Sequence, residues 1–394
     1  MVNNLKIEKD KCCGCEACVN ICPQNCISMQ SDEEGFLYPI INKKNCISCN
    51  LCEKVCPFKK NLQKNKEPII FAAKSNDVLR YQSSSGGIFP ELAKIIFKNE
   101  GVVFGAVMSS NNRKVIYKSA SSIEELLPIQ GSKYIQAEIR DTYSIIKKLL
   151  LQGKKVLFTG TTCQVAGLKT YLNKDYDNLI CVDVICHGVP SPLMWNKYCD
   201  YLEDKYYHGI DSVSFRSKKY SWNEFGIHLD VGKKVFEFSF QNPYFRLFNS
   251  NLCLRPSCYA CQVKGLKNLS DISLGDFWHI ERLVPSFKDK KGISIVLVNT
   301  QKGLDIFKEC ILNGKTEIIL ENITYEQACM CNNAIYKSMT KSIRRDEFFS
   351  ELIVKNFLEI KDKYSPDSWK YSLKSFLIKI RIWKIFQKFR KGIN

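Results

Sequence analysis

The sequence predicts an α+β protein in which a small cysteine-rich domain precedes a larger mixed α/β domain with antiparallel strands, followed by a basic helix. Three observations lead to this fold class. Cysteine clusters repeat within the first sixty or so residues, apolar segments of strand and helix length alternate after residue 68, and basic residues crowd the C-terminal end. We expect three parts, at residues 1–65, 66–345 and 346–394.

The composition excludes disorder for most of the chain and favours acidic partners. Of the 394 residues, 45% are hydrophobic, which is enough apolar material for a sizeable core. The formal charge of +18 suits phosphates, nucleic acid, anionic lipid or an acidic carrier protein. The start of the chain does not resemble a signal peptide, and no apolar run is long enough to cross a membrane. We therefore expect a cytoplasmic protein with reduced thiols.

Two copies of the spacing C-x2-C-x2-C-x3-C-P occupy the first part of the chain. They comprise Cys12, Cys15, Cys18 and Cys22, and then Cys46, Cys49, Cys52 and Cys56. Three thiolates at this spacing can bind three irons of a [4Fe-4S] cluster, while the fourth thiolate comes from the other repeat. The predicted ligand sets are therefore Cys12, Cys15, Cys18 and Cys56 for one cluster, and Cys46, Cys49, Cys52 and Cys22 for the other. Structural zinc is the alternative, but zinc sites rarely use this three-cysteine run.

Cys13 and Cys26 lie outside this spacing, and we expect them to be packed rather than bound. Beyond a polar linker at residues 59–67, the alternation of short apolar and helix-length segments is typical of α/β folds. Strands are expected at residues 69–74, 102–108, 156–159 and 293–299, and a helix at residues 88–98. Between residues 212 and 240 apolar side chains recur at every second position, which indicates antiparallel strands.

Six motifs follow one another along the larger domain. They are S-S-S-G-G at residues 83–87, G-S-K-Y at 131–134, F-T-G-T-T-C-Q-V-A-G-L-K from 158, C-H-G-V-P-S-P at 186–192, R-P-S-C-Y-A-C at 255–261 and D-I-S-L-G-D-F-W at 271–278. In this order, and behind the cysteine repeats, they resemble the coenzyme F420 hydrogenase/dehydrogenase beta-subunit family, in the branch that begins with a two-cluster ferredoxin domain. The resemblance covers the chain from Cys12 to about Gly303.

This resemblance implies an iron–sulfur flavoprotein oxidoreductase that contains FAD and a third [4Fe-4S] cluster. Family members include F420 reducers, reductases of chlorophyll derivatives and bacterial proteins linked to surface polysaccharide synthesis. The ligand set implied for the third cluster is Cys163, Cys186, Cys258 and Cys261. From their spacing alone, Cys258 and Cys261 fit half of a zinc site or a redox dithiol equally well, and Cys253 is the substitute ligand.

The candidate flavin-binding residues lie at two helix starts and in the G-S-K-Y motif. They are Ser84, Ser85, Gly86, Gly87, Lys133, Gly160, Thr161, Thr162 and Gln164. Free N–H groups and the helix dipole at the S-S-G-G start favour a diphosphate, although a plain helix cap has the same sequence. Lys133 suits a flavin phosphate or the reduced flavin ring, and a surface ion pair is the alternative. Similar family members have proline where Thr162 stands, so we expect a different loop shape there.

His187 is the candidate catalytic residue because it lies beside a presumed cluster ligand and can supply a proton during hydride transfer. A structural role for this histidine is the alternative, and Asp276 is a weaker candidate of the same kind.

The C-terminal segment from Ser368 to Asn394 contains eight Lys or Arg residues and no Asp or Glu. On a helical projection one face holds Trp369, Leu373, Phe376, Ile380 and Trp383. Another face holds Lys370, Lys374, Arg381, Lys384 and Lys388. A basic amphipathic helix of this kind either contacts anionic lipid at the inner face of the membrane or packs on the protein's own body or a partner.

Two functions follow from these observations. In the first, electrons pass between ferredoxin or another acidic carrier, the clusters and FAD, and then to or from a small organic molecule. In the second, the chain is a non-catalytic electron relay or scaffold within a larger complex. Nucleic-acid binding is not expected, because the basic residues form no known reading motif.

Overall fold

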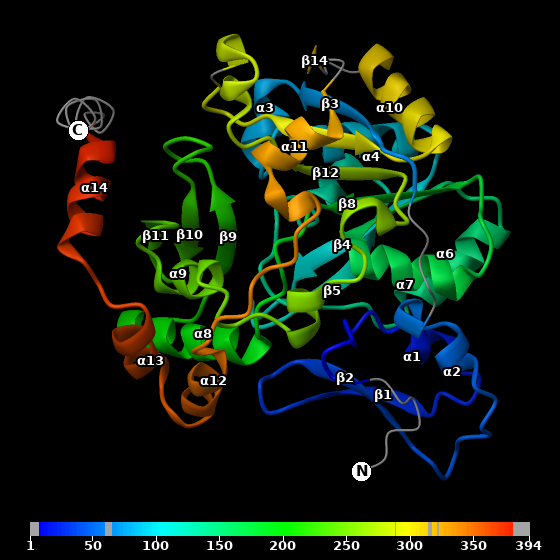
Figure 1. Ribbon diagram of the computed structural model, residues 1–394, viewed down its shortest axis with the longest axis horizontal. Coiled ribbons are helices and arrows are strands. Elements are labelled where there is room, and N and C mark those ends of the chain that lie inside the picture. The colour runs from blue at the N-terminus through cyan, green and yellow to red at the C-terminus, as the bar shows by residue number, and fades with distance from the viewer. Residues whose placement is uncertain (1–7, 60–64, 288, 314–316, 321–322, 381–394) are drawn as a thin grey trace.

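The computed structural model describes residues 8–59, 65–287, 289–313, 317–320 and 323–380. A small N-terminal domain lies below a larger body (Figure 1). In the small domain, two short helices pack together beside an antiparallel strand pair in which Ile27 lies opposite Ile41. Its elements are α1 (Ala17–Ile21), β1 (Ile27–Ser31), β2 (Leu37–Ile41) and α2 (Leu51–Lys54).

A nine-stranded mixed sheet forms the centre of the body. Its strands, in spatial order, are β14 (Glu317–Leu320), β3 (Ile69–Lys74), β13 (Ser294–Val298), β12 (Ile272–Asp276), β8 (Leu179–Val184), β7 (Val156–Thr161), β4 (Val102–Met108), β5 (Val115–Ala120) and β6 (Ala137–Glu138). The four strands β12, β8, β7 and β4 are parallel. Because the carboxyl ends of parallel strands meet at one edge, the loops after β7 and β8 lie together there.

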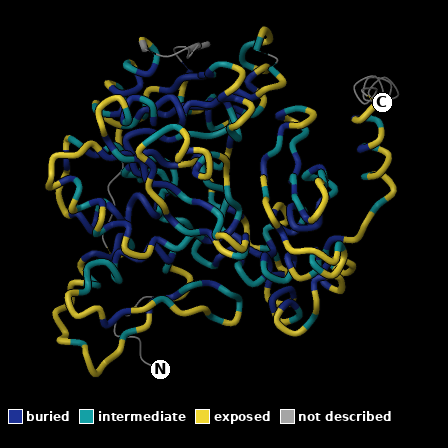
Figure 2. Tube along the Cα trace, turned by 180° about the vertical axis from the view of Figure 1, so that it is seen from behind, coloured by how far each residue is buried: buried dark blue, intermediate teal, exposed yellow. Residues whose placement is uncertain are grey.

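Helices cover both faces of this sheet, and each face has its own apolar cluster. Val103, Leu157 and Val182 pack under α4 and α10, whereas Phe104 and Phe158 face α6 and α7. The helices of the body are α3 (Asp77–Gln82), α4 (Ile88–Lys98), α5 (Ile123–Leu126), α6 (Thr142–Leu151), α7 (Thr162–Leu172), α10 (Gln301–Asn313) and α11 (Tyr325–Cys331). Figure 2 shows the buried segments concentrated in this central sheet.

A second, antiparallel sheet lies beside the body with the remaining helices. Its strands are β9 (Ser212–Ser217), β10 (Gly226–Asp230) and β11 (Lys234–Phe238), and the helices are α8 (Pro192–Tyr206), α9 (Pro243–Asn249), α12 (Arg345–Val354), α13 (Phe357–Tyr364) and α14 (Trp369–Lys379). An aromatic cluster around Trp195 and Phe215 joins α8, α9 and this sheet. None of the described helices has both the length and the apolarity needed to cross a bilayer.

The expected mixed α/β architecture is confirmed, and the helix at 88–98 and the strands at 69–74 and 102–108 have the expected bounds. The C-terminal part differs from the expected single basic segment. Helices α12 and α13 contribute Phe348, Leu352 and Phe357 to the aromatic cluster, so they belong to the core of the body. Only α14 has the expected basic amphipathic character, and the part of the segment beyond residue 380 lies outside the described residues.

A buried arginine and a glycine join the two domains. The guanidinium group of Arg255 donates to the carbonyl oxygens of Cys12 (2.7 Å) and Leu37 (3.0 Å) in the small domain and to Oε1 of Gln136 (3.1 Å) in the body. On helix α7, a Cβ atom at Gly167 would lie 2.8 Å from Cβ of Cys15, so only hydrogen fits between helix and loop. The small domain is therefore held in direct contact with α7.

Replacing Arg255 by methionine keeps the side-chain length but leaves these three acceptors unpaired in a buried junction. We expect the free energy of unfolding to fall by about 3 kcal/mol, as measured by anaerobic denaturant unfolding. The control is Arg140→Met, because the exposed side chain of Arg140 pairs only with Glu138 and its loss costs less than about 0.5 kcal/mol. Equal losses in the two variants would contradict the proposed role of Arg255.

Candidate functional site

The two cysteine repeats curve around their cavities with the same backbone geometry. In each repeat the residues on either side of the middle cysteine have positive φ angles: Gly14 (70°) and Glu16 (59°), and Ser48 (55°) and Asn50 (58°). Left-handed residues at these equivalent positions turn the loop so that successive thiols point to one centre. The internal repeat seen in the sequence is thus also a repeat of backbone conformation.

Each of the two cavities is lined by three cysteines of one repeat and one of the other. Cys12, Cys15, Cys18 and Cys56 line the first cavity. Cys22, Cys46, Cys49 and Cys52 line the second, which has a volume of about 310 Å³. These are the groupings of the predicted ligand sets. Among the described residues, no three His, Cys, Asp or Glu side chains are arranged as ligands of one metal ion.

The two cysteines outside the spacing also lie at these cavities. Cys26 lines the second cavity, with its Sγ atom 3.4 Å from that of Cys22. Cys13 lines the first cavity, and its thiol is within hydrogen-bonding reach of both Cys15 and Cys163. Cys13 therefore lies between the small domain and the third group of cysteines, a contact that its sequence context did not indicate.

The four dispersed cysteines line one further cavity of about 60 Å³ at the carboxyl end of the central strands. They are Cys163 in the first turn of α7, Cys186 after β8, and Cys258 and Cys261 in the turn that follows Arg255. The N–H group of Val189 donates to Sγ of Cys258 at 3.4 Å. The ammonium group of Lys264 donates to the Cys186 carbonyl oxygen and lowers the pKa of the Cys186 thiol, although burial raises it more. Cys253 is buried elsewhere and does not line this cavity.

A much larger cavity of about 770 Å³ adjoins the third cysteine cavity. Its lining combines the start of α4, the G-S-K-Y segment and aromatic residues of the second sheet and α9. Of the candidate flavin-binding residues, Ser84, Ser85, Gly87, Lys133 and Thr161 line it. The carboxyl-end loops of β7 and β8 complete the lining, as expected for a ligand site in an α/β fold.

The other four candidates shape the loops without lining the large cavity. Gly86 donates its N–H group to Oγ of Ser294 and packs too closely on β3 and β13 for any side chain. The Gln164 side chain closes a capping box with Thr161 at the start of α7. A Cβ atom at Gly160 would lie 2.5 Å from the hydroxyl of Tyr117. These residues therefore have a structural explanation in the turn between β7 and α7.

Thr162, which stands in place of the family's proline, ties its loop to the sheet. Its hydroxyl donates to the carboxylate of Asp183, which also accepts a hydrogen bond from Ser270 at 2.7 Å. Burial raises the pKa of Asp183, whereas hydrogen bonds from Ser273, Thr162 and Ser270 lower it. A proline has no hydroxyl for this contact, so the substitution changes how the loop is held.

Lys133 makes neither of the contacts considered for it. Its Nζ atom donates to the carbonyl oxygens of Pro128 (2.7 Å), Ile129 (2.9 Å) and Gln130 (2.9 Å), and burial lowers the pKa of its ammonium group to about 7. The lysine therefore closes the preceding turn while its stem lines the cavity.

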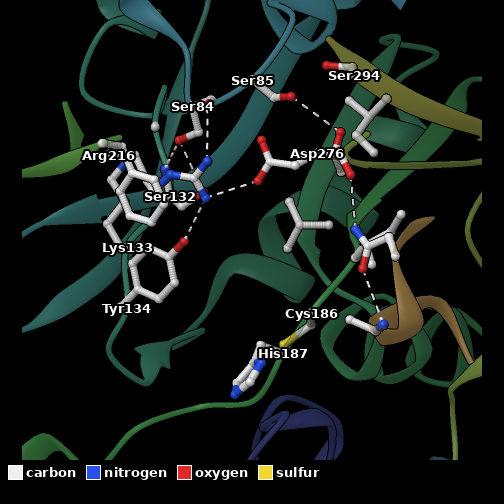
Figure 3. A pocket seen from close by; sticks show the side chains of 18 of the residues that line it. Ser84, Ser85, Ser132, Lys133, Tyr134, Cys186, His187, Arg216, Asp276 and Ser294 are labelled. Carbon is white, nitrogen blue, oxygen red and sulfur yellow. Dashed lines mark hydrogen bonds and ion pairs between the residues drawn. The ribbon is translucent and has the colours of Figure 1, made fainter. Parts of the chain in front are cut away.

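Arg216 on β9 is the main feature of the large cavity that sequence reasoning missed. Figure 3 shows its guanidinium group between Tyr134, Ser84 and Asp276. It pairs with Asp276 at 3.0 Å and lies 3.9 Å from the ring centroid of Phe225, while its Nε atom has no hydrogen-bond partner among the described residues. A charged residue in a period-two strand usually faces solvent, so only the three-dimensional partners identify this one.

His187 lies at the boundary between the large cavity and the third cysteine cavity, next to Cys186 (Figure 3). Its Nε2 atom is 2.7 Å from Oδ1 of Asn251, and its ring packs on Phe248. Burial lowers the pKa of His187, and the Asn251 contact opposes this shift. The histidine is thus oriented by a fixed partner and reaches both cavities.

Comparison with known proteins supports the resemblance read from the motifs. Residues 153–324 match the family model for the C terminus of the beta subunit of coenzyme F420 hydrogenase/dehydrogenase, and residues 11–60 match the 4Fe-4S dicluster domain. The chain belongs to the coenzyme F420 hydrogenase/dehydrogenase beta-subunit family. Its N-terminal domain is accordingly a 4Fe-4S dicluster domain, and the family assignment makes the chain an iron–sulfur redox protein.

One solved structure similar to this family member is that of the F420-reducing [NiFe] hydrogenase complex from Methanosarcina barkeri, reported for its xenon derivatization. A chain of that complex has 17% sequence identity and a TM-score of 0.46, over 69% of this chain and 90% of that chain. No curated protein matches the chain.

The residues present fit the two groups that the family resemblance implies in addition. Four thiols around one cavity, with Lys264 beside them, suit an anionic iron–sulfur cluster. In the large cavity, three buried polar atoms lack hydrogen-bond partners among the described residues: Ser83 Oγ, Gln130 Oε1 and Arg216 Nε. Buried polar atoms normally find partners, so these atoms suit a polar ligand such as a flavin nucleotide.

Replacing Thr162 by valine removes one of the donors to the buried Asp183 carboxylate. Because the pKa of Asp183 is higher in the folded than in the unfolded state, ionisation opposes folding, and loss of a donor strengthens this effect. We expect the variant to lose about 1.5 kcal/mol of stability at pH 8 and progressively less as the pH falls through the folded-state pKa. Denaturant unfolding at several pH values measures this.

The matched control is Thr170→Val. The Thr170 hydroxyl is also buried in α7 but donates to the backbone carbonyl oxygens of Ala166 and Gly167, which do not titrate. Its loss should therefore be independent of pH. A loss in Thr162→Val that is equally independent of pH would show that the Asp183 hydrogen bond is not the cause.

Proposed function

We propose that the protein is a flavin-dependent oxidoreductase in which single electrons pass between an acidic carrier such as ferredoxin, three [4Fe-4S] clusters and FAD. A small organic molecule is the final acceptor or donor. One observation carries the proposal: the third cysteine cavity and the large cavity share a wall. Cys186, His187 and Val189 line both cavities.

The cysteine cavities form a continuous series through the molecule. The second and first cavities lie side by side in the small domain, where each is completed by a cysteine of the other repeat. The first cavity reaches the third through Cys13, which contacts both Cys15 and Cys163, and through the close packing of Gly167 on Cys15. This order supports electron transfer from the surface of the small domain to the large cavity.

We assign each group of residues a role in this scheme. The predicted ligand sets bind the two clusters of the small domain, and Cys163, Cys186, Cys258 and Cys261 bind the third cluster. The start of α4, at Ser84, Ser85 and Gly87, faces the diphosphate of FAD, whose flavin would supply the conversion between single electrons and a hydride. Arg216 lies over the large cavity as a fixed positive charge, and His187 holds a proton where the two cavities meet.

The proposal is tested by metal and flavin analysis of protein purified without oxygen. The wild type should contain about twelve irons per chain and one FAD. In Cys186→Ala/Cys258→Ala, iron should fall to about eight, and electrons supplied to the small domain should no longer reduce the flavin. Cys253→Ala is the control, because this cysteine is equally buried but lies outside the cavity, and it should keep all the iron.

Two results would contradict the proposal. The first is a wild type that binds no flavin after addition of FAD, which would favour the relay or scaffold role. The second is iron content that is unchanged in the double variant, since the third cluster would then be absent or bound elsewhere.

The electron carrier would meet the protein at the second cysteine cavity. Cys49 is exposed there, and Ile47, which lines the same cavity, exposes 61% of its surface. Lys43 and Lys44 are exposed in the loop before Cys46, whereas Glu53 is already paired with Lys59 at 2.8 Å. An apolar patch with positive flanks suits an acidic carrier.

Reversing the charge in Lys43→Glu/Lys44→Glu should slow reduction by an acidic ferredoxin about tenfold or more at low salt, because the steering field changes sign. The effect should shrink as the salt concentration rises. Stopped-flow reduction of the clusters measures it, and reduction by dithionite should stay unchanged. Lys98→Glu/Lys308→Glu is the charge-matched control on α4 and α10. If both double variants slow the reaction equally, general charge rather than this surface controls docking.

A further inference from the structure

Helix α14 presents the wrong face to solvent for a helix that serves only to cover the protein. Trp369, Leu373, Phe376 and Ile380 form one stripe along the helix, and their exposed fractions are 71%, 38%, 57% and 43%. Exposure of a contiguous apolar stripe is costly in water, so such a stripe indicates a contact that forms elsewhere. Figures 1 and 2 both place α14 at the edge of the molecule, beside the second sheet.

The opposite face of α14 makes the contact with the body. Lys374 lies 4.0 Å from the ring centroid of Phe240, and Tyr371 packs on the same ring with 6.4 Å between centroids. Arg246 lies 4.8 Å from the Tyr371 ring, and Ile378 is buried. At 100° per residue this packed face points directly away from the apolar stripe. The helix is therefore attached through its more polar side, which leaves the apolar side free.

Positive charge borders the stripe on both sides. Lys370 and Lys379 are exposed and lie about 90° from the stripe on either side of the helix. The nearest preceding carboxylate, that of Asp367, is already paired with Lys361 at 2.6 Å and Arg246 at 3.4 Å. No acidic residue occurs from Ser368 to the end of the chain. An apolar stripe with cationic borders is the pattern of a helix that lies in a membrane interface.

We propose that α14 binds an anionic lipid bilayer, with its axis parallel to the surface and the stripe of Trp369, Leu373, Phe376 and Ile380 among the lipid headgroups and upper acyl chains. The charge distribution favours this occupant over a second copy of the chain, because two copies would bring segments with only positive charges together. It also separates the two roles considered for this helix, since packing on the protein's own body uses the other face. The proposal does not depend on the proposed redox function.

Co-sedimentation of the full chain with vesicles tests the proposal. The wild type should bind vesicles of mixed phosphatidylglycerol and phosphatidylcholine and bind pure phosphatidylcholine about tenfold more weakly or less. Trp369→Ser/Phe376→Ser should weaken binding to the mixed vesicles about tenfold or more, because both side chains are exposed apolar contacts. Lys370→Glu/Lys379→Glu should remove the preference for the anionic lipid. Tyr81→Ser/Tyr207→Ser is the control, since both tyrosines are exposed aromatic residues elsewhere.

Fluorescence quenching by brominated lipids adds a positional readout. Vesicle-dependent quenching should occur in the wild type and should be largely lost in Trp369→Phe, which retains vesicle binding. Three results would overturn the proposal: no binding of the wild type to anionic vesicles, equal binding by the wild type and Trp369→Ser/Phe376→Ser, or a wild-type dimer that this double variant dissociates without any vesicle binding. The last result would assign the stripe to contact between copies.

Discussion

The direct contact between the small domain and helix α7 is the constraint on which the rest of the molecule depends. Electron transfer requires short separations between redox centres, and here no linker or water layer separates the loop of Cys15 from the helix that carries Cys163. The contact is made from backbone atoms and one arginine. The cationic Arg255 has no aqueous environment, so its hydrogen bonds to three oxygen atoms are needed to keep it in the junction.

The same economy of position applies to the body. Parallel strands place the loops after β7 and β8 at one edge of the sheet, and these loops carry Cys163, Cys186 and His187. The third cysteine cavity and the large cavity share a wall because both are built from the same loops. The fold therefore accounts for the neighbourhood of the two cavities without any further adjustment, and the side chains at the edge determine what each cavity can bind.

Local patterns predicted the elements well, but they could not predict which partner each element meets. Strand β3 and helix α4 have the expected bounds because apolar period and length are properties of the chain itself. Arg216 was missed because its burial depends on Asp276, which lies sixty residues further along the sequence. A helical projection likewise separated the two faces of α14 but gave no sign that the face with Lys374 would contact the body. The regular cysteine spacing was the exception, since it encodes its own tertiary grouping.

Gly167 gives the junction a property that side chains could not provide. With hydrogen alone between α7 and Cys15, the thickness of insulating material between the first and third cysteine groups is set by main-chain geometry. Substitutions on the outer faces of either domain can accumulate without altering that gap. Tunnelling across the junction is consequently protected from sequence drift everywhere except at this one position and its immediate neighbours.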